Sequence, residues 1–129
     1  MNLESPLVIV PKSVDEIKQF LANYSNFKQI FPKEVNHFEV HENGFTFGLG
    51  ALPKVGLKRS TPMHDKQIAL ESTGGPVTFK LLCDMRDVDD QNTECQICFE
   101  GDVNPMLRMM LEKPLQNLLN QLADGLSKS

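Results

Sequence analysis

The last quarter of the chain, from Asn104 to Ser129, reads NPMLRMMLEKPLQNLLNQLADGLSKS. Asn104 offers a side chain suited to a helix N-cap, and Pro105 follows at the first helical position. Apolar residues then recur at three- and four-residue steps as far as Leu126, with polar residues in the gaps, as in an amphipathic helix. Pro114 lies inside this pattern and predicts a bend just before it. The segment therefore predicts one long helix, which needs an apolar surface to pack against.

The region from Val35 to Val103 changes from a helical period to the two-residue period of strands. Its last hairpin has the clearest pattern, with alternate apolar residues on both arms and a turn at Asp89–Asn92. One register puts every apolar side chain on the same face, through the pairs Cys83–Ile97, Met85–Cys95 and Leu81–Phe99. A sheet with one wet face is antiparallel and is covered on its other face. We expect the C-terminal helix to provide that cover.

The N-terminal part supplies the remaining elements. Pro6–Val10 is a short apolar run typical of a strand. Ser13–Glu16 has the form of a capping box, which predicts a helix start, and a second short helix is expected at Phe27–Phe31 before Pro32. Asn43-Gly44 predicts a hairpin turn. The expected order is one strand, two short helices, about six antiparallel strands and one long helix.

This order of elements resembles the START-related superfamily, also called SRPBCC. The resemblance also rests on the segment Asn26–Pro32 after the first helix and on Asp102–Pro105 before the last. It is nearest to small bacterial members of the polyketide cyclase/dehydratase-like, coenzyme-Q-binding or carbon monoxide dehydrogenase-related kinds. The resemblance implies an α+β helix-grip fold over residues 1–129 as a single domain. In this fold a curved antiparallel sheet, here of about six or seven strands, wraps around a long C-terminal helix.

The resemblance further implies an apolar pocket between the sheet and the long helix, entered past the short helices and nearby loops. Candidate ligand-binding residues are the apolar side chains on the facing surfaces together with one arginine, namely Phe27, Ile30, Phe31, Phe47, Leu57, Arg59, Phe79, Leu81, Met85, Ile97, Met106, Met109 and Met110. Phe27, Ile30 and Phe31 would form the lid, and the flexible methionine thioethers would adapt to the ligand. The alternative is that these residues simply fill the core.

The polar candidates give little sign of catalysis. Arg59 shares a strand face with Leu57, so it would either orient an anionic group in the pocket or extend its head into water. His37, Glu39 and His41 fall on the wet face of their strand, where solvated surface is the simpler reading. No catalytic residue is predicted, and the superfamily shares none that could be carried over.

The cysteines also argue against a metal or redox site. Cys95 and Cys98 have CxxC spacing, but residues three apart on a strand face opposite sides of the sheet. Their thiols therefore cannot meet each other or one metal ion. No metal and no cofactor is predicted. With three cysteines, which cannot form a closed disulfide set, a reducing cytoplasm is the expected location.

Composition excludes several classes of partner. A net charge of −4 and a pI near 5.3 argue against nucleic acid, which needs a concentrated basic face. No apolar run is long enough to span a membrane, and Met1–Pro11 lacks the features of a signal peptide. The pattern carries no signal for an oligomeric state.

The leading hypothesis is a non-enzymatic protein that binds or transports an apolar or amphipathic small molecule, such as a lipid, quinone or polyketide-like compound. The alternatives are an enzyme of the polyketide cyclase/dehydratase type and a protein-docking module with a filled core. An enzyme needs at least two ionisable groups in the pocket, and the sequence offers only Arg59. A docking module would instead expose an apolar patch.

Overall fold

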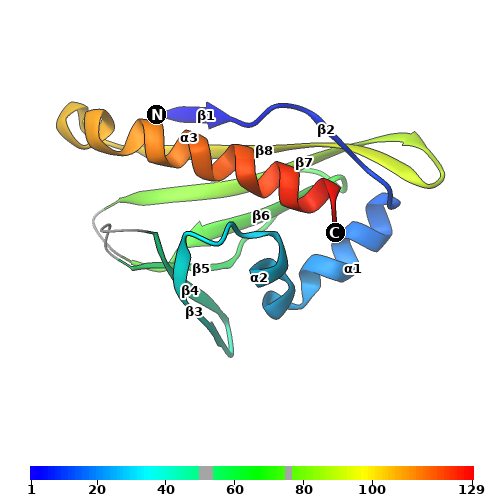
Figure 1. Cartoon of the computed structure of the whole chain (residues 1–129), viewed down its shortest axis with the longest axis horizontal. Helices are drawn as coiled ribbons and strands as arrows, with labels where there is room; N and C mark the ends of the chain where they lie inside the picture. The colour runs from blue at the N-terminus through cyan, green and yellow to red at the C-terminus, as the bar shows by residue number, and fades with distance from the viewer. Residues whose placement is uncertain (50–53, 75–76) are drawn as a thin grey trace.

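The computed structural model describes residues 1–49, 54–74 and 77–129 (Figure 1). Along the chain its elements are β1 (Asn2–Glu4), β2 (Val8–Val10), α1 (Val14–Ala22), a 3-10 turn (Tyr24–Asn26), α2 (Phe27–Ile30), β3 (Val35–His41), β4 (Gly44–Leu49), β5 (Val55–Arg59), β6 (Gln67–Ser72), β7 (Thr78–Asp89), β8 (Asn92–Asp102) and α3 (Pro105–Ser127). The described strands form one antiparallel sheet in the order β1-β8-β7-β6-β5-β4-β3. β2 also pairs with β8, along the first part of that strand, whereas β1 pairs with its last part. In Figure 1, α3 lies along one face of the curved sheet. The helices α1 and α2 lie near the C-terminal end of α3. The predicted helix-grip α+β fold is confirmed.

The long hairpin of β7 and β8 has the register that the apolar pattern predicted. Its Cα partners include Leu81 with Phe99, Cys83 with Ile97 and Met85 with Cys95. The turn lies at Asp89–Asn92 as predicted, with Asp89 and Asn92 paired as the last residue of β7 and the first residue of β8. The Asp89 carboxylate accepts hydrogen bonds from the Gln91 backbone and the Asn92 side chain, which lower the pKa of Asp89.

The N-terminal strand is divided, which the sequence pattern did not predict. β1 and β2 both pair with β8, and between the pairs Glu4–Cys98 and Val8–Cys95 one strand carries an extra residue, as in a β-bulge. Pro6 has no N–H to donate to the ladder. At the break, the Ser5 N–H donates to the Ile97 carbonyl at 2.8 Å, and the Ile97 N–H donates to Ser5 Oγ at 2.9 Å. The hydroxyl thus replaces a missing backbone acceptor.

The first helix begins with the predicted capping box. The Glu16 N–H donates to Ser13 Oγ at 3.1 Å, and the Ser13 N–H donates to the Glu16 carboxylate at 3.0 Å. These hydrogen bonds lower the pKa of Glu16. The second short helix is also found, between the 3-10 turn and Pro32.

The β3–β4 hairpin carries the aromatic part of the core. Phe45 stacks on Phe27 with ring centroids 4.9 Å apart and on Phe38 with centroids 5.2 Å apart. The register between β3 and β4 shifts between Asn36 and Glu39, where His37 has a positive φ of 51°. His37, Glu39 and His41 are exposed, as their position on the wet face predicted. The apolar alternation of this strand in the sequence predicts that it continues to Ala51, which lies outside the described residues.

The C-terminal helix begins as predicted and buries only part of its length. Asn104 Oδ1 accepts the Leu107 N–H at 2.9 Å, and Pro105 occupies the first turn. The buried residues all lie after Pro114: Leu118, Leu119, Leu122, Ala123 and Leu126. In Figure 1 the first turns of α3 lie at the edge of the molecule. Within the part of the chain that the structure describes, no helix is long and apolar enough to cross a membrane.

Candidate functional site

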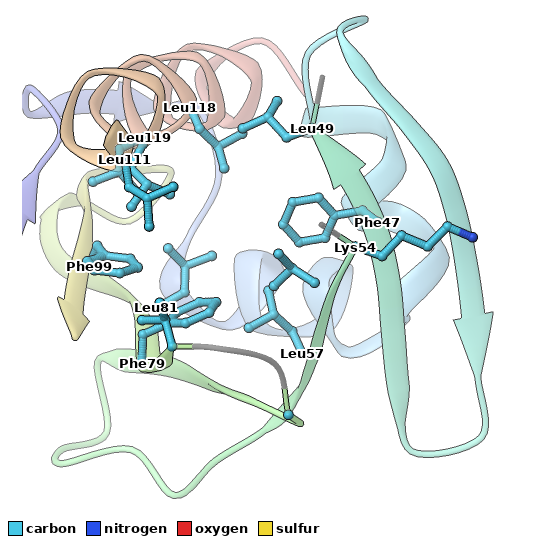
Figure 2. Close-up of a pocket in the computed structure, with 14 residues that line it drawn as sticks. Phe47, Leu49, Lys54, Leu57, Phe79, Leu81, Phe99, Leu111, Leu118 and Leu119 are labelled. Atoms are coloured by element: carbon cyan, nitrogen blue, oxygen red, sulfur yellow. The ribbon is translucent and has the colours of Figure 1, made fainter. Parts of the chain in front are cut away.

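A cavity of about 100 Å³ lies between α3 and the inner face of the sheet; we call it the main cavity (Figure 2). Its lining comes from β4, β5, β7, β8, α3 and the adjoining segments, and consists of Phe47, Leu49, Lys54, Val55, Leu57, Gly74, Val77, Phe79, Leu81, Phe99, Leu111, Leu115, Leu118 and Leu119. Figure 2 shows Leu111, Leu118 and Leu119 on one side of this space and Phe47 and Leu57 on the other. Apart from Lys54 and Gly74, the described lining is made of apolar side chains.

Strand alternation explains why these residues face the cavity. Phe47 pairs with Val55, and Leu81 pairs with Phe99, so both pairs lie on the inner face of the sheet. Phe79 and Phe99 stack with ring centroids 5.0 Å apart. Gly101 makes room for this stack, because a Cβ at this position would lie only 2.8 Å from the Phe99 ring. The aromatic end of the cavity is thus set by two strands and one glycine.

The cavity opens where its lining is least buried. Lys54 and Gly74 are exposed, and Val77, Leu111 and Leu115 are half-buried. Phe47, Leu57 and Leu119 are buried and lie deeper. The opening therefore lies between the strand ends and the first half of α3. Phe27, Ile30 and Phe31 do not line this opening, and the predicted entrance past the short helices and nearby loops stays a prediction.

No ionisable side chain of the described lining points into the main cavity. Lys54 is the only charged member, and in Figure 2 its nitrogen points away from the space. The strand period gives the reason: Val55 and Leu57 face inward, so Lys54 faces the opposite side of the sheet. The site offers apolar contact area and no proton donor or acceptor from these side chains.

A smaller cavity of about 20 Å³ lies in the same core, between the short helices, β6 to β8 and the second half of α3; we call it the inner cavity. Its lining is Leu21, Phe27, Ile30, Ile68, Leu70, Leu81, Leu82, Cys83, Ile97 and Leu122. The space is just large enough for one water molecule, but its apolar walls offer little for a water to bind. Leu81 borders this cavity as well as the main one.

The structure divides the predicted site residues among several places. Phe47, Leu57, Phe79 and Leu81 border the main cavity, and Phe27, Ile30 and Ile97 border the inner cavity together with Leu81. Phe31 packs on Phe47 with ring centroids 4.8 Å apart, and Met85 is buried in the core. Neither Phe31 nor Met85 borders either cavity. Their part in binding stays a prediction.

The predicted position of the three α3 methionines is wrong. The exposed fractions of Met106, Met109 and Met110 are 76%, 86% and 62%, and none of them borders a cavity. At 100° per residue, these side chains point roughly 125–165° away from the middle of the leucine face. They therefore extend into solvent, although they belong to the same helix as the cavity wall.

The predicted position of Arg59 in the pocket is also wrong. Its guanidinium donates to the carbonyl oxygens of Leu21 at 3.3 Å and Ala22 at 3.2 Å, at the end of α1. It also lies over the Tyr24 ring at 5.5 Å from the centroid. A positive charge at a helix C-terminus satisfies terminal carbonyls and complements the helix dipole. Arg59 therefore joins β5 to α1 and does not reach the cavity.

Several lining residues were missed as ligand contacts: Leu49, Val55, Val77, Phe99, Leu111, Leu115, Leu118 and Leu119. The helical ones carried a usable signal, because Leu111, Leu115, Leu118 and Leu122 repeat at steps of four, three and four. Following that repeat from Leu122 back toward the N-terminus reaches Leu111 and does not include the methionines.

The three cysteines lie as the strand period predicted. Cys83 and Cys95 are buried on the inner face, whereas Cys98 is half-buried on the outer face beside Asp84. All three are free, and among the described residues no group of potential ligands is arranged to hold a metal ion. Burial and the nearby Asp84 carboxylate raise the pKa of Cys98 to about 11.

We expect Cys98 to react first with a thiol reagent in the native protein, and to react slowly. The thiolate is the reactive form, so a pKa of about 11 makes Cys98 roughly 100-fold less reactive at pH 8 than an ordinary cysteine. The rate should rise about tenfold per pH unit up to that pKa. Mass spectrometry after timed labelling would identify the modified residue, and Asp84→Asn should speed the reaction. Equal labelling of all three cysteines would contradict their assignment to opposite faces.

Comparison with known proteins identifies the fold. No protein-family model matches the chain, and no curated relative matches it at a significant level. A START superfamily protein from Mycobacterium smegmatis has a TM-score of 0.74 at 16% identity, covering 98% of this chain and 94% of that one. Norcoclaurine synthase from Thalictrum flavum, in complex with dopamine and hydroxybenzaldehyde, has a TM-score of 0.73 at 14% identity, covering 99% and 84%. The di-domain ARO/CYC BexL from the BE-7585A biosynthetic pathway also reaches 0.73 at 14% identity, covering 99% and 45%.

The chain therefore has the START-related, or SRPBCC, helix-grip fold that its element order indicated. The structural matches cover all of its elements at low sequence identity. Such a likeness defines the architecture, while binding and chemistry depend on the residues of this chain's own cavity.

Proposed function

We propose that this protein binds an apolar small molecule, or the apolar part of an amphipathic one, in the main cavity. The observation that carries the proposal is the lining itself, an open space between sheet and helix whose described walls are almost wholly apolar. An apolar ligand gains about 0.8 kcal/mol for each methylene that it buries in such a site. The fold neighbours add support, because norcoclaurine synthase is itself seen with small aromatic molecules.

The volume of the cavity limits the size of the ligand that it can hold. A cavity of about 100 Å³ is somewhat smaller than the roughly 150 Å³ apolar cavity known to bind benzene. We therefore expect a short alkyl chain or a small ring inside the cavity, with any polar group left at the opening. A lipid, quinone or polyketide-like compound would place only one end of its structure inside the cavity and leave the rest at the opening.

The same lining favours binding or transport over catalysis. A cyclase or dehydratase needs groups that move protons at the bound substrate. The described residues direct no ionisable side chain into the main cavity. The docking-module alternative combines a filled core with an exposed apolar patch. The exposed methionines of α3 fit the second feature, whereas the main cavity argues against the first. The three free cysteines support a cytoplasmic setting for this binding protein.

We expect Leu115→Trp to weaken binding of a neutral apolar dye such as Nile red by at least tenfold (about 1.4 kcal/mol). Leu115 is half-buried at the opening of the cavity, so a larger side chain there should occupy the space that a ligand needs. Met109→Trp is the matched control, since Met109 lies on the same helix but is 86% exposed. Dye fluorescence titrations would measure both variants, with circular dichroism to confirm folding.

The control separates cavity binding from adsorption to the surface. Equal affinities in the two variants would place the dye outside the main cavity. Failure of the folded wild-type protein to bind any apolar probe would reject the proposed function. The titration should allow hours for equilibration, because a narrow opening slows entry.

A further inference from the structure

We propose that Leu81 is the partition between the main and inner cavities, and that it thereby sets the length of ligand that this protein accepts. The inference rests on the proposed function, because it assigns a specificity-determining residue to the same site. Leu81 is the only described residue that borders both cavities. The two spaces therefore lie on opposite sides of one side chain.

The order of residues along β7 and α3 shows how the cavities succeed each other. On the inner face of β7, Phe79 borders only the main cavity, Leu81 borders both, and Cys83 borders only the inner cavity. On α3, Leu118 borders the main cavity and Leu122, one turn further on, borders the inner cavity. Strand and helix thus place the two cavities one after the other in the core, with Leu81 between them.

Packing around Leu81 differs from that of its neighbours in the sheet. Its Cα partners are Leu70 on β6 and Phe99 on β8, and these side chains are both 2% exposed. Leu81 is only partly buried, although it lies between them. A side chain beside empty space has fewer contacts to lose when it changes rotamer or is shortened. Leu81 is therefore the wall residue whose removal should join the cavities at the least structural cost.

The path beyond Leu81 suits an unbranched alkyl chain. Ile68, Ile97 and Leu122 supply apolar walls to the inner cavity, and Cys83 contributes a thiol. A hydrogen bond with the Cys95 thiol, together with burial, raises the pKa of Cys83, so its thiol stays neutral. An alkyl terminus entering this space would meet no charge. The ligand class that follows is a short, linear, uncharged chain that ends at Leu81 in the wild-type protein.

The test measures binding of 1-alkanols from butanol to decanol by calorimetry. Affinity for the wild type should rise about fourfold with each added methylene and then stop rising when the chain end reaches Leu81. In Leu81→Ala the rise should continue for at least two further carbons, about a 15-fold gain at the longer length. Leu57→Ala is the matched control, because Leu57 is a buried leucine that borders only the main cavity.

A second readout gives the position of the chain end independently of affinity. With a labelled terminal methyl group on the alkanol, intermolecular NOEs should reach Ile68 and Ile97 in Leu81→Ala. Both isoleucines border only the inner cavity, so these NOEs should be absent in the wild type and in Leu57→Ala. If Leu81→Ala does not fold, Leu81→Val should show the same changes to a smaller extent.

The outcomes distinguish the two proposals. NOEs to Ile68 and Ile97 in the wild type, or an unchanged length limit in folded Leu81 variants, would overturn the partition and leave binding in the main cavity intact. A length limit that moves as far in Leu57→Ala as in Leu81→Ala would also overturn it. No binding of any alkanol to the wild type would overturn both proposals together.

Discussion

Replacing Leu122 with alanine is expected to lower the free energy of unfolding by about 2–5 kcal/mol. Leu122 is 1% exposed and lies on the buried face of α3. Alanine has a slightly higher helix propensity than leucine, so the loss must come from packing. The change removes apolar contacts and leaves a void that the neighbouring side chains only partly fill. Urea unfolding followed by circular dichroism would give the difference.

Met109→Ala on the same helix is the control for this prediction. Met109 is 86% exposed, so its truncation should change the free energy of unfolding by less than about 0.5 kcal/mol. The two variants differ in burial while sharing the helix and the replacement residue. Losses of similar size would mean that α3 is rotated about its axis, with the methionines packed inside.

Gly125→Ala is expected to destabilise the protein by about 2 kcal/mol, against the intrinsic preference of a helix. In an exposed helix the same change would stabilise by about 1 kcal/mol. In α3, however, a Cβ at position 125 would clash with the carbonyl oxygen of Ile30 and lie 3.0 Å from its carbonyl carbon and Cα. These are backbone atoms of α2, so no side chain can rotate out of the way. Either α3 or α2 must move.

Gln121→Ala serves as the matched control, because Gln121 is exposed one turn earlier on α3. It should leave stability unchanged or slightly raised, since alanine favours the helix and no packing is lost. Thermal and urea unfolding of both variants would provide the comparison. A stabilised Gly125→Ala variant would show that α2 and α3 are further apart than the structure has them.

Local sequence patterns predicted the elements and their faces well where one interaction dominates. Ser13 and Glu16 cap the same helix that their spacing indicates, and Asn104-Pro105 begins α3. The β7–β8 register was predictable because a one-residue slip would turn every apolar side chain to the wet face. These features depend on residues close in sequence or on one repeating pattern, so the sequence carries them directly.

Site residues were harder to predict, because lining a cavity depends on what the opposite wall leaves empty. Phe47, Leu57, Phe79 and Leu81 were found through strand alternation, whereas Leu111 and Leu115 were passed over for more flexible methionines. Hydrophobicity alone does not separate these groups. The two groups differ in their angular position around the helix axis. That position decides which side chains line the cavity only when the sheet packs against one side of the helix.

By itself, the sequence of this protein determined the order of elements, the helix caps, the long hairpin's register and an apolar face on each element. The tertiary structure alone decided that the Ser5 hydroxyl bridges a break in the first strand, that Arg59 binds the end of α1, and that Leu81 lies between two cavities. The physical reason is the range of the interactions. Caps and strand periods act between residues near in sequence or paired by pattern, whereas empty space and long polar contacts arise only when distant segments pack together.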